Sequence, residues 1–503
     1  MTIAESGNPL QPERPTLSSL AWVAALIAAM TVLRCIFAAT LDLRTDEAYY
    51  WTWSKESALS FLDHPPMIAW FIRLGTAIFG DTNFGVRFAG LLAMPISQLL
   101  LADIVRRVTR DIRAAVLAVL MMEAALYYGL LMAKVAPDVA LIPFELAMVW
   151  SLVRLTESGD ARWWLAAGFF GGLALLSKLT ALMLVPAVVL FIVVPDWRSR
   201  WLRSPYLWAA PLIAAAVFSP VLIWNWMHDW ASFRFQFVRA TAAHGVTLRT
   251  LGDYLGLQFG QVGPILLPVV LVGVAVTAWR GFRHRDPVSV LLSAAVLVPF
   301  GYFLWKSLTL RVGDTWPMFI WPLGFAATAI DIAKRSREKW PAWIARSSAF
   351  WVNAAIASGL VLVVAVFLYY RRQPLEFHRQ DRSDRRRSRL RAGREPRRKR
   401  IAGRRGDMDR DRRLPDLCDA ALASEGSRAG DPDQRTQPLH GFPRSRFRAD
   451  CRACRAVHRP RAGRCIPSGL DRRGADAVGS GSTDLARPDH GHLCSGKTDG
   501  LDT

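Results

Sequence analysis

Long apolar runs recur along this chain from about residue 18 to residue 370, and they constrain its fold more than any other feature. A helix needs about 20 residues to cross the apolar part of a bilayer. Eleven runs of roughly this length follow one another: 18–40, 86–105, 114–133, 139–153, 163–176, 179–195, 206–224, 256–278, 288–304, 315–333 and 349–370. We therefore predict an all-α polytopic membrane protein with about eleven transmembrane helices.

The loop charges predict how these spans are oriented. Arginine and lysine gather in the loops near residues 106–113, 198–203, 280–285 and 334–339, and with eleven spans all four loops fall on the same side. Cytoplasmic loops are rich in Lys and Arg, so this side is predicted to be cytoplasmic. The acidic and aromatic loops (41–85, 134–138, 225–253 and 305–314) then share the outer face, which is periplasmic in a Gram-negative bacterium.

The stretch from Leu41 to Pro66, within the first outer loop, concentrates polar side chains between two apolar runs. It contains Asp42, Asp46, Glu47, Asp63 and His64, interleaved with Tyr49, Tyr50, Trp51 and Trp53. Carboxylates among aromatic rings at a membrane boundary cost free energy unless they are solvated, paired or used. An ordinary hydrated loop is the alternative, but the acidic pair, the aromatic side chains and the His-Pro-Pro end together favour a functional site.

This outer region is too long for a simple turn. Ala48–Leu62 and Met67–Phe79 alternate apolar and polar residues in a roughly helical rhythm. They predict two amphipathic juxtamembrane helices on the membrane surface. Pro65 and Pro66 separate the two helices and fix the direction of the chain, which would place Asp63 and His64 on a stiff corner.

Other outer segments add charged groups, namely Asp138, Lys178, His228, Asp229, Arg234 and Arg311. Each has a structural alternative: Asp138 could cap a helix, Lys178 could reach the membrane surface or form an ion pair, and segment 224–236 could be an interfacial aromatic belt. Taken together, however, carboxylates can accept a proton from an attacking hydroxyl, and cations can stabilise a leaving phosphate. The combination favours sugar transfer from a lipid-phosphate donor over a pore.

These residues resemble the polytopic glycosyltransferases of clan C, specifically glycosyltransferase family 39 and its bacterial branch similar to the lipid A aminoarabinose transferase and the protein O-mannosyltransferases. The resemblance covers about residues 18–370. It is carried by Asp46-Glu47, Asp63-His-Pro-Pro66, Arg87, Pro137-Asp138, Ser177-Lys178 and the segment Asn225-x-x-His-Asp-Trp-Ala-Ser-Phe. It implies an inverting transfer from a polyprenyl-phosphate sugar to lipid A, another surface glycan or a protein, on the outer face of a bacterial inner membrane.

The resemblance also implies roles for single residues. Asp46 would be the general base, Glu47 its neighbour in the acceptor site, and Asp138 a second functional acidic position. His64 stands where relatives often carry Lys, so Lys178 and Arg311 are expected to share the binding of the donor phosphate with it. Substrate binding is assigned to Tyr50, Asp63, His228 and Asp229. Some relatives bind a divalent metal near this corner; Asp63, His64 and His228 could ligate one, but three scattered residues predict no particular metal, and no other cofactor is implied.

The composition changes abruptly at Arg371. The tail from 371 to 503 holds 33 basic and 19 acidic residues, none of the 20 Trp or 9 Tyr, and 5 of the 6 Cys. We therefore divide the chain into a short cytoplasmic segment (1–17), a transmembrane domain (18–370) and a basic low-complexity tail (371–503), which is predicted to be disordered because it lacks the apolar side chains of a core. The net charge of +22 thus says little about partners.

A shifted reading frame in a GC-rich gene, replacing a soluble outer domain, is our preferred interpretation of this tail. Cys451, Cys454, His458 and Cys465 could suggest zinc, but their spacing fits no regular ligand pattern. Its arginines could suggest a nucleic-acid-binding domain, but such a domain outside the membrane makes little sense.

Two other functions share these sequence features. A transporter or flippase of lipid-linked sugars would have the same spans and outer charges, although transporters usually carry ionisable groups at the bilayer midplane and internal repeats. The charges of this chain instead cluster at the ends of its spans. A non-catalytic binding or assembly partner with the same fold could be excluded only by an activity measurement.

Overall fold

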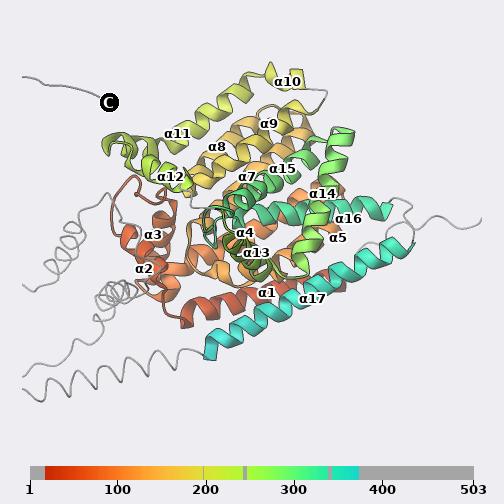
Figure 1. Cartoon of the computed structure of the whole chain (residues 1–503), viewed down its shortest axis with the longest axis horizontal. Coiled ribbons are helices and arrows are strands. Elements are labelled where there is room, and N and C mark those ends of the chain that lie inside the picture. The colour runs from red at the N-terminus through yellow and green to blue at the C-terminus, as the bar shows by residue number, and fades with distance from the viewer. Residues whose placement is uncertain (1–16, 196–197, 242–245, 338–341, 373–503) are drawn as a thin grey trace, which may run out of the picture. The chain divides into compact units, whose positions relative to one another are not determined.

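The computed structural model describes residues 17–195, 198–241, 246–337 and 342–372, which all lie in the compact unit Met1–Ala421 (Figure 1). These residues form helices and no strand, so the all-α prediction is confirmed. The tail and nearly all of the short N-terminal segment lie outside the described residues, and their limits stay predictions. The elements in chain order are α1 (Leu17–Thr40), α2 (Thr45–Ser54), α3 (Met67–Phe79), α4 (Asn83–Thr109), α5 (Ile112–Ala124), α6 (Leu126–Gly129), η1 (Leu131–Ala133), α7 (Pro137–Ser158), α8 (Trp163–Ser177), η2 (Leu179–Leu184), α9 (Val185–Val193), α10 (Arg198–Leu202), α11 (Pro205–Met227), α12 (Ala231–Thr241), α13 (Leu248–Val262), α14 (Leu266–His284), α15 (Pro287–Lys306), η3 (Met318–Ile320), α16 (Trp321–Arg337) and α17 (Ala342–Arg372).

Six helices of the described chain are long and apolar enough to cross a membrane: α4, α7, α11, α14, α15 and residues 349–370 of α17. Helices α1 and α2 together would also be long and apolar enough to cross a membrane, but the chain bends by 82° between them. Other predicted spans are broken into shorter pieces. The run 256–278, for example, divides into α13 and α14 at Gly263, whose φ of +124° favours glycine, and at Pro264, which lacks the N–H of a continuous helix.

Close packing of small residues joins two of the helices. Gly168 and Gly172 of α8 face α11, and a Cβ atom at Gly168 would collide with the backbone of Ala210. The absence of side chains at these two positions therefore lets α8 and α11 approach closely. The largest apolar core lies beside them and draws its side chains mainly from α4, α5, α7, α8, α14, α15 and α16.

A second apolar cluster connects the two ends of the membrane domain. Phe37 of α1 and Phe367 of α17 are buried in it together with Leu91 of α4. The ring of Phe37 also meets the ring of Tyr370 edge-on, with the centroids 6.1 Å apart. The last helix thus closes against the first, and Figure 1 shows both along the same edge of the molecule.

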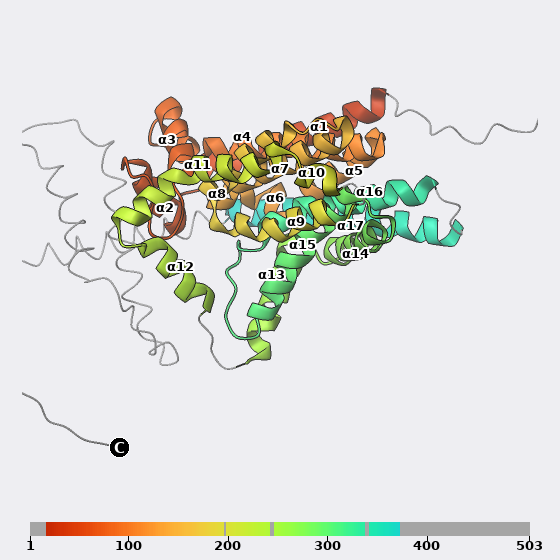
Figure 2. The same ribbon diagram turned by 90° about the horizontal axis from the view of Figure 1, so that it is seen from above.

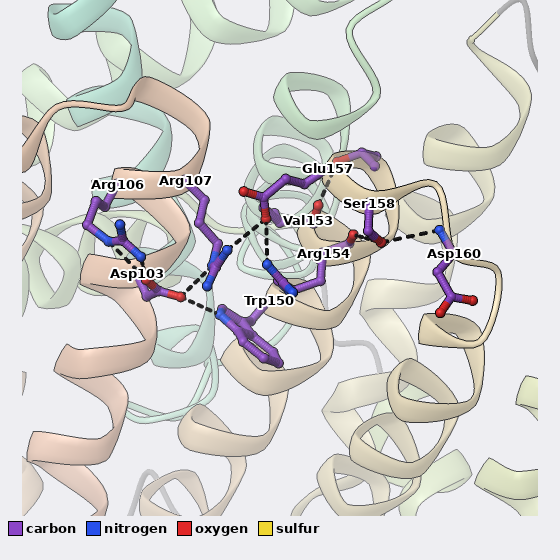
Figure 3. Close-up of polar contacts among 10 residues, drawn as sticks. Asp103, Arg106, Arg107, Trp150, Val153, Arg154, Glu157, Ser158 and Asp160 are labelled. Atoms are coloured by element: carbon purple, nitrogen blue, oxygen red, sulfur yellow. Dashed lines mark hydrogen bonds and ion pairs between the residues drawn. The ribbon is translucent and has the colours of Figure 1, made fainter.

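A network of charged side chains joins the C-terminal parts of α4 and α7 (Figure 3). Asp103 accepts hydrogen bonds from Arg107 at 2.6 Å and from the indole of Trp150 at 2.8 Å. Glu157 accepts from Arg107 at 2.7 Å and from Arg154 at 2.9 Å. The bonds connect one helix to the other, so the network fixes this end of the pair. The opposite, N-terminal parts carry two residues singled out in the sequence, Arg87 of α4 and Asp138 of α7.

The two short helices of the first outer loop are both present. Helix α3 has the predicted bounds, Met67–Phe79, whereas α2 covers Thr45–Ser54 rather than Ala48–Leu62. Arg73 explains the early end of α2, because its guanidinium donates to the backbone carbonyls of Ser54 and Glu56. Those carbonyls are thereby satisfied outside a helix.

Candidate functional site

A cavity of about 120 Å³ lies beside the His-Pro-Pro corner. Its walls come from that corner, from the start of η2, from α12, from the end of α15 and from the loop before η3. In Figure 2, α12 and the start of α13 stand away from the main helix bundle. The polar side chains of the wall are Asp63, His64, Lys178, Thr180, Gln236, Arg239, Tyr302 and Lys306.

Lys178 forms a buried ion pair in the wall of this cavity. Its Nζ donates to both carboxylate oxygens of Asp138, at 2.8 and 2.9 Å, and the two side chains are 4% and 0% exposed. Asp138 lies in the first turn of α7, behind Ala136 at the N-cap, so it is not the helix cap considered above. An ammonium group has three N–H donors. Two are used by Asp138, which leaves the third for a group in the cavity.

Glu47 forms a second buried ion pair, with Arg87 of α4. Two parallel hydrogen bonds of 2.7 Å join the carboxylate to the guanidinium, and both side chains are almost fully buried. The carboxylate also accepts the backbone N–H groups of Arg44 and Val135, each at 3.0 Å. Glu47 therefore ties α2 to α4 and to the segment before α7, and it does not line the cavity.

Asp46, the preceding residue, has the opposite surroundings. Its side chain is exposed at the first turn of α2, and it makes no hydrogen bond or ion pair within the described part of the chain. The ring of Tyr50 lies on the same helix, 6.1 Å from the ring of His64. Burial raises the pKa of the Tyr50 hydroxyl well above its usual value, and the negative charges of Asp46, Asp138 and Asp63 raise that pKa further. Tyr50 is thus a neutral hydrogen-bond donor among three carboxylates.

The corner at Asp63 and His64 is held by side chains from other elements. The Tyr49 hydroxyl donates to the Asp63 carboxylate at 2.8 Å, and Gln236 of α12 donates to the Asp63 carbonyl at 2.6 Å. Burial lowers the pKa of His64 to about 3, and the charges of Lys178 and Arg239 lower it too. At neutral pH, His64 therefore faces the cavity as an uncharged imidazole, which can donate a hydrogen bond but supplies no positive charge.

Two cations of the cavity wall were not selected from the sequence as site residues. Arg239 of α12 lies over the ring of Trp316 at 4.5 Å, and Lys306 at the end of α15 lies over Trp305 at 4.9 Å. Arg311, which the resemblance assigned to the donor phosphate, is exposed and does not line the cavity. The available sequence signal for Arg239 was its spacing of three residues from Gln236 on one helix.

The aromatic segment after α11 builds a turn. Asn225 is fully buried, and its side-chain oxygen accepts the N–H groups of Ser232 and Phe233 at 3.1 and 3.2 Å, so it satisfies the start of α12. His228 stacks on Trp224, with a centroid distance of 4.1 Å, and Asp229 has a φ of +52°. Both are exposed and outside the cavity wall, so their assignment to substrate binding stays a prediction.

The described residues do not fit the divalent metal considered above. No three His, Cys, Asp or Glu side chains in this part of the chain are close enough together to hold a metal ion. His228, one of the suggested ligands, accompanies Trp224 on the α11–α12 turn, whereas Asp63 and His64 line the cavity. We therefore assign no step of the chemistry to a metal.

Known proteins resemble this chain in sequence. A family model described as dolichyl-phosphate-mannose-protein mannosyltransferase matches residues 63–224. The lipid A galacturonosyltransferase RgtD of Rhizobium johnstonii is 29% identical over 309 residues, which cover 56% of this chain and 62% of the relative. The undecaprenyl phosphate-alpha-4-amino-4-deoxy-L-arabinose arabinosyl transferase of Aeromonas salmonicida is 27% identical over 315 residues, or 59% of this chain and 54% of the relative. The chain thus spans less than two thirds of the length of these relatives.

A solved structure shares the fold. The crystal structure of ArnT from Cupriavidus metallidurans bound to undecaprenyl phosphate matches with a TM-score of 0.52 and 14% identity, covering 70% of this chain and 76% of that chain. The apolar helices and this shared fold make the chain an integral membrane protein.

We expect Glu47→Gln to destabilise the membrane domain by about 3–5 kcal/mol, because the buried guanidinium of Arg87 would lose its counter-charge. Thermal unfolding in detergent would measure the loss. The double variant Glu47→Leu/Arg87→Met should recover part of it, because it leaves no unpaired charge. A single variant as stable as the wild type would contradict this account of the ion pair.

The neutral His64 predicts a pH dependence of stability. An unfolded histidine takes up a proton below about pH 6.5, whereas folded His64 takes one up only near pH 3, so the wild type should lose stability as the pH falls between these values. On going from pH 7 to pH 5, the free energy of unfolding of the wild type should fall by about 2 kcal/mol more than that of His64→Gln. Chemical unfolding at both pH values measures it, and an equal pH dependence of the two proteins would refute a neutral His64.

Proposed function

We propose a function for this chain on the premise that it is a relative of the family 39 glycosyltransferases, which the family match over residues 63–224 and the similarity to the named relatives support. It transfers a sugar from a polyprenyl-phosphate donor to a hydroxyl of a lipid A, surface glycan or protein acceptor. The observation that carries the proposal is the arrangement of charge. Lys178, Arg239 and Lys306 line one cavity together with His64. The charge of the exposed Asp46 acts on Tyr50, whose ring lies 6.1 Å from that of His64.

The cations of the cavity would hold the donor phosphate. Lys178 keeps one N–H for the cavity, and Arg239 and Lys306 add two positive charges. The hydroxyl of Thr180 is buried in the same wall and has no hydrogen-bond partner within the described residues, which suits a contact with a polar head group. Fixed cations stabilise a leaving phosphate more strongly than they stabilise the intact donor, because negative charge increases on that group as the bond breaks.

Transfer would be a single displacement with inversion. The acceptor hydroxyl oxygen attacks the anomeric carbon while the bond from this carbon to the phosphate oxygen breaks, and the polyprenyl phosphate leaves with the bonding electrons. Asp46 accepts the hydroxyl proton, because it is an exposed carboxylate that pairs with no cation among the described residues. Glu47 keeps α2 in place through Arg87, and Asp138 keeps Lys178 in the cavity wall. The resemblance assigned Glu47 to the acceptor site and Asp138 to a second functional acidic position. Both residues would fulfil these roles indirectly, through their ion pairs.

We also propose where the chain lies in the cell. Eleven spans would put the Asp46 loop and the cavity on the periplasmic face of the inner membrane, in contact with the lipid bilayer that supplies the donor. The tail from 371 to 503 would stand where relatives carry a soluble outer domain. A transporter of lipid-linked sugars would use the same cavity, but it would need no exposed base at Asp46.

We expect Asp46→Asn to lower the rate of sugar transfer by ~10²–10⁴-fold, because it removes the general base. Membranes containing equal amounts of each variant would be supplied with labelled polyprenyl-phosphate sugars and an acceptor lipid extract. Asp42→Asn, a change at an exposed carboxylate of the same loop, is the matched control and should keep its rate. Equal transfer by both variants would reject Asp46 as the base, and movement of the donor across vesicle membranes without transfer would favour the transporter.

Besides Lys178, the cavity points to Arg239 as a cation that binds the donor phosphate, whereas the family resemblance points to Arg311. A pair of variants distinguishes the two. We expect Arg239→Gln to raise the donor KM about tenfold, the loss of one charge-assisted contact of about 1.4 kcal/mol. Arg311→Gln and the control Arg249→Gln, both at exposed positions, should change the KM less than threefold. If Arg311→Gln instead raised the donor KM more than Arg239→Gln did, Arg311 would be the residue that binds the donor phosphate, and the cavity would not be the donor site.

A further inference from the structure

Glu145 is a buried carboxyl group to which the proposed reaction gives no role. It lies within α7, two helical turns after Asp138 and on the same side of the helix. Its side chain is fully buried, and neither carboxylate oxygen has a hydrogen-bond partner within the described residues. Unlike the charged residues at the ends of the spans, Glu145 lies in the middle of a predicted span (139–153).

Glu123 of α5 shows what a buried glutamate ordinarily requires. It is buried to the same degree, but its two oxygens accept hydrogen bonds from Arg34 at 2.7 and 3.0 Å, and Gln98 donates to it at 2.6 Å. A charge of this kind is tolerated inside a membrane domain because it is paired and hydrogen-bonded. Glu145 has neither form of compensation.

The groups around Glu145 cannot supply the missing charge. Asp138 on the same helix and Lys178 at the end of α8 are its charged neighbours, and Lys178 already gives two of its N–H donors to Asp138. Tyr128 of α6 is the other titratable neighbour, and its hydroxyl donates to the carbonyl of Met318. Two carboxyl groups thus share one ammonium, so the three groups are electrically neutral only if one of them carries an additional proton.

We propose that Glu145 is a buried proton-binding site, whose carboxyl group keeps its proton at neutral pH. The proton spares the membrane domain an uncompensated charge. It also leaves Lys178 paired with a single carboxylate, so that the third N–H of its ammonium serves the cavity. This second consequence rests on the proposed function, whereas the proton site itself does not.

Thermodynamic linkage gives the proton site a measurable signature. In the unfolded chain Glu145 contacts water and loses its proton above about pH 4.3, whereas the folded chain retains it. The unfolded state therefore binds fewer protons, and the stability of the wild type falls as the pH rises. Glu145→Gln has no proton to lose, so its folding equilibrium constant should increase tenfold per pH unit relative to that of the wild type.

The experiment compares the full-length wild type, Glu145→Gln and Glu123→Gln in detergent at pH 6, 7 and 8. The ratio of folding equilibrium constants between Glu145→Gln and the wild type should grow about 100-fold across this range. Glu123→Gln is the matched control: it should destabilise the protein by about 100-fold or more at every pH, because it leaves Arg34 unpaired. A pH-independent ratio for Glu145→Gln would overturn the proton site.

A kinetic measurement tests the effect on Lys178. Glutamine is neutral like the protonated acid, so Glu145→Gln should keep the donor KM of the wild type within about twofold at pH 7. A KM raised tenfold with an unchanged kcat would show that a negative charge at this position is needed, and would overturn this part of the proposal. If none of the proteins transfers sugar, the proposed function fails, while the stability comparison still decides whether Glu145 holds a proton.

Discussion

The ion pair between Glu47 and Arg87 is the interaction on which the candidate site depends. It joins residues 40 positions apart, and its carboxylate reaches the backbone of both the α1–α2 bend and the segment before α7. Arg87 also donates to the carbonyl groups of Ala38, Leu41 and Asp42. A chain that bends by 82° exposes backbone carbonyls that a straight helix would satisfy. One guanidinium supplies donors for them and for the carboxylate, and thereby fixes the orientation of α2.

This orientation separates two consecutive carboxylates. Neighbouring residues of a helix point about 100° apart, so when Glu47 faces Arg87 in the interior, Asp46 faces outward. The same element therefore provides both a structural anchor, Glu47, and an exposed carboxylate, Asp46. Asp138 and Lys178 form a second buried ion pair, and the charge of Asp138 also acts on Tyr50. Here a buried carboxylate holds an ammonium that lines the cavity.

The sequence predicted what depends on local pattern. Several apolar runs coincide with long helices, namely α4, α7, α11 and α15, and α3 begins and ends as predicted. Lys178 was recognised as a cation that reaches the membrane surface, forms a pair or binds an anion. It could not predict what depends on distant contacts. The early end of α2 comes from Arg73, the pairing of Glu47 comes from Arg87, and the presence of Arg239 in the cavity comes from the turn that Asn225 builds. Glu145 could not be singled out from the sequence for the same reason, because only the packed structure shows that no described side chain pairs with it.

The close contact of α8 with α11 has a mechanical consequence for the cavity. Lys178 directly follows α8, and α12, which carries Arg239, begins at the turn that ends α11. Because Gly168 and Gly172 let the two helix backbones approach closely, this pair can tilt as one body but cannot readily slide apart. Variation in bilayer thickness would then move both cations together and preserve the spacing between them.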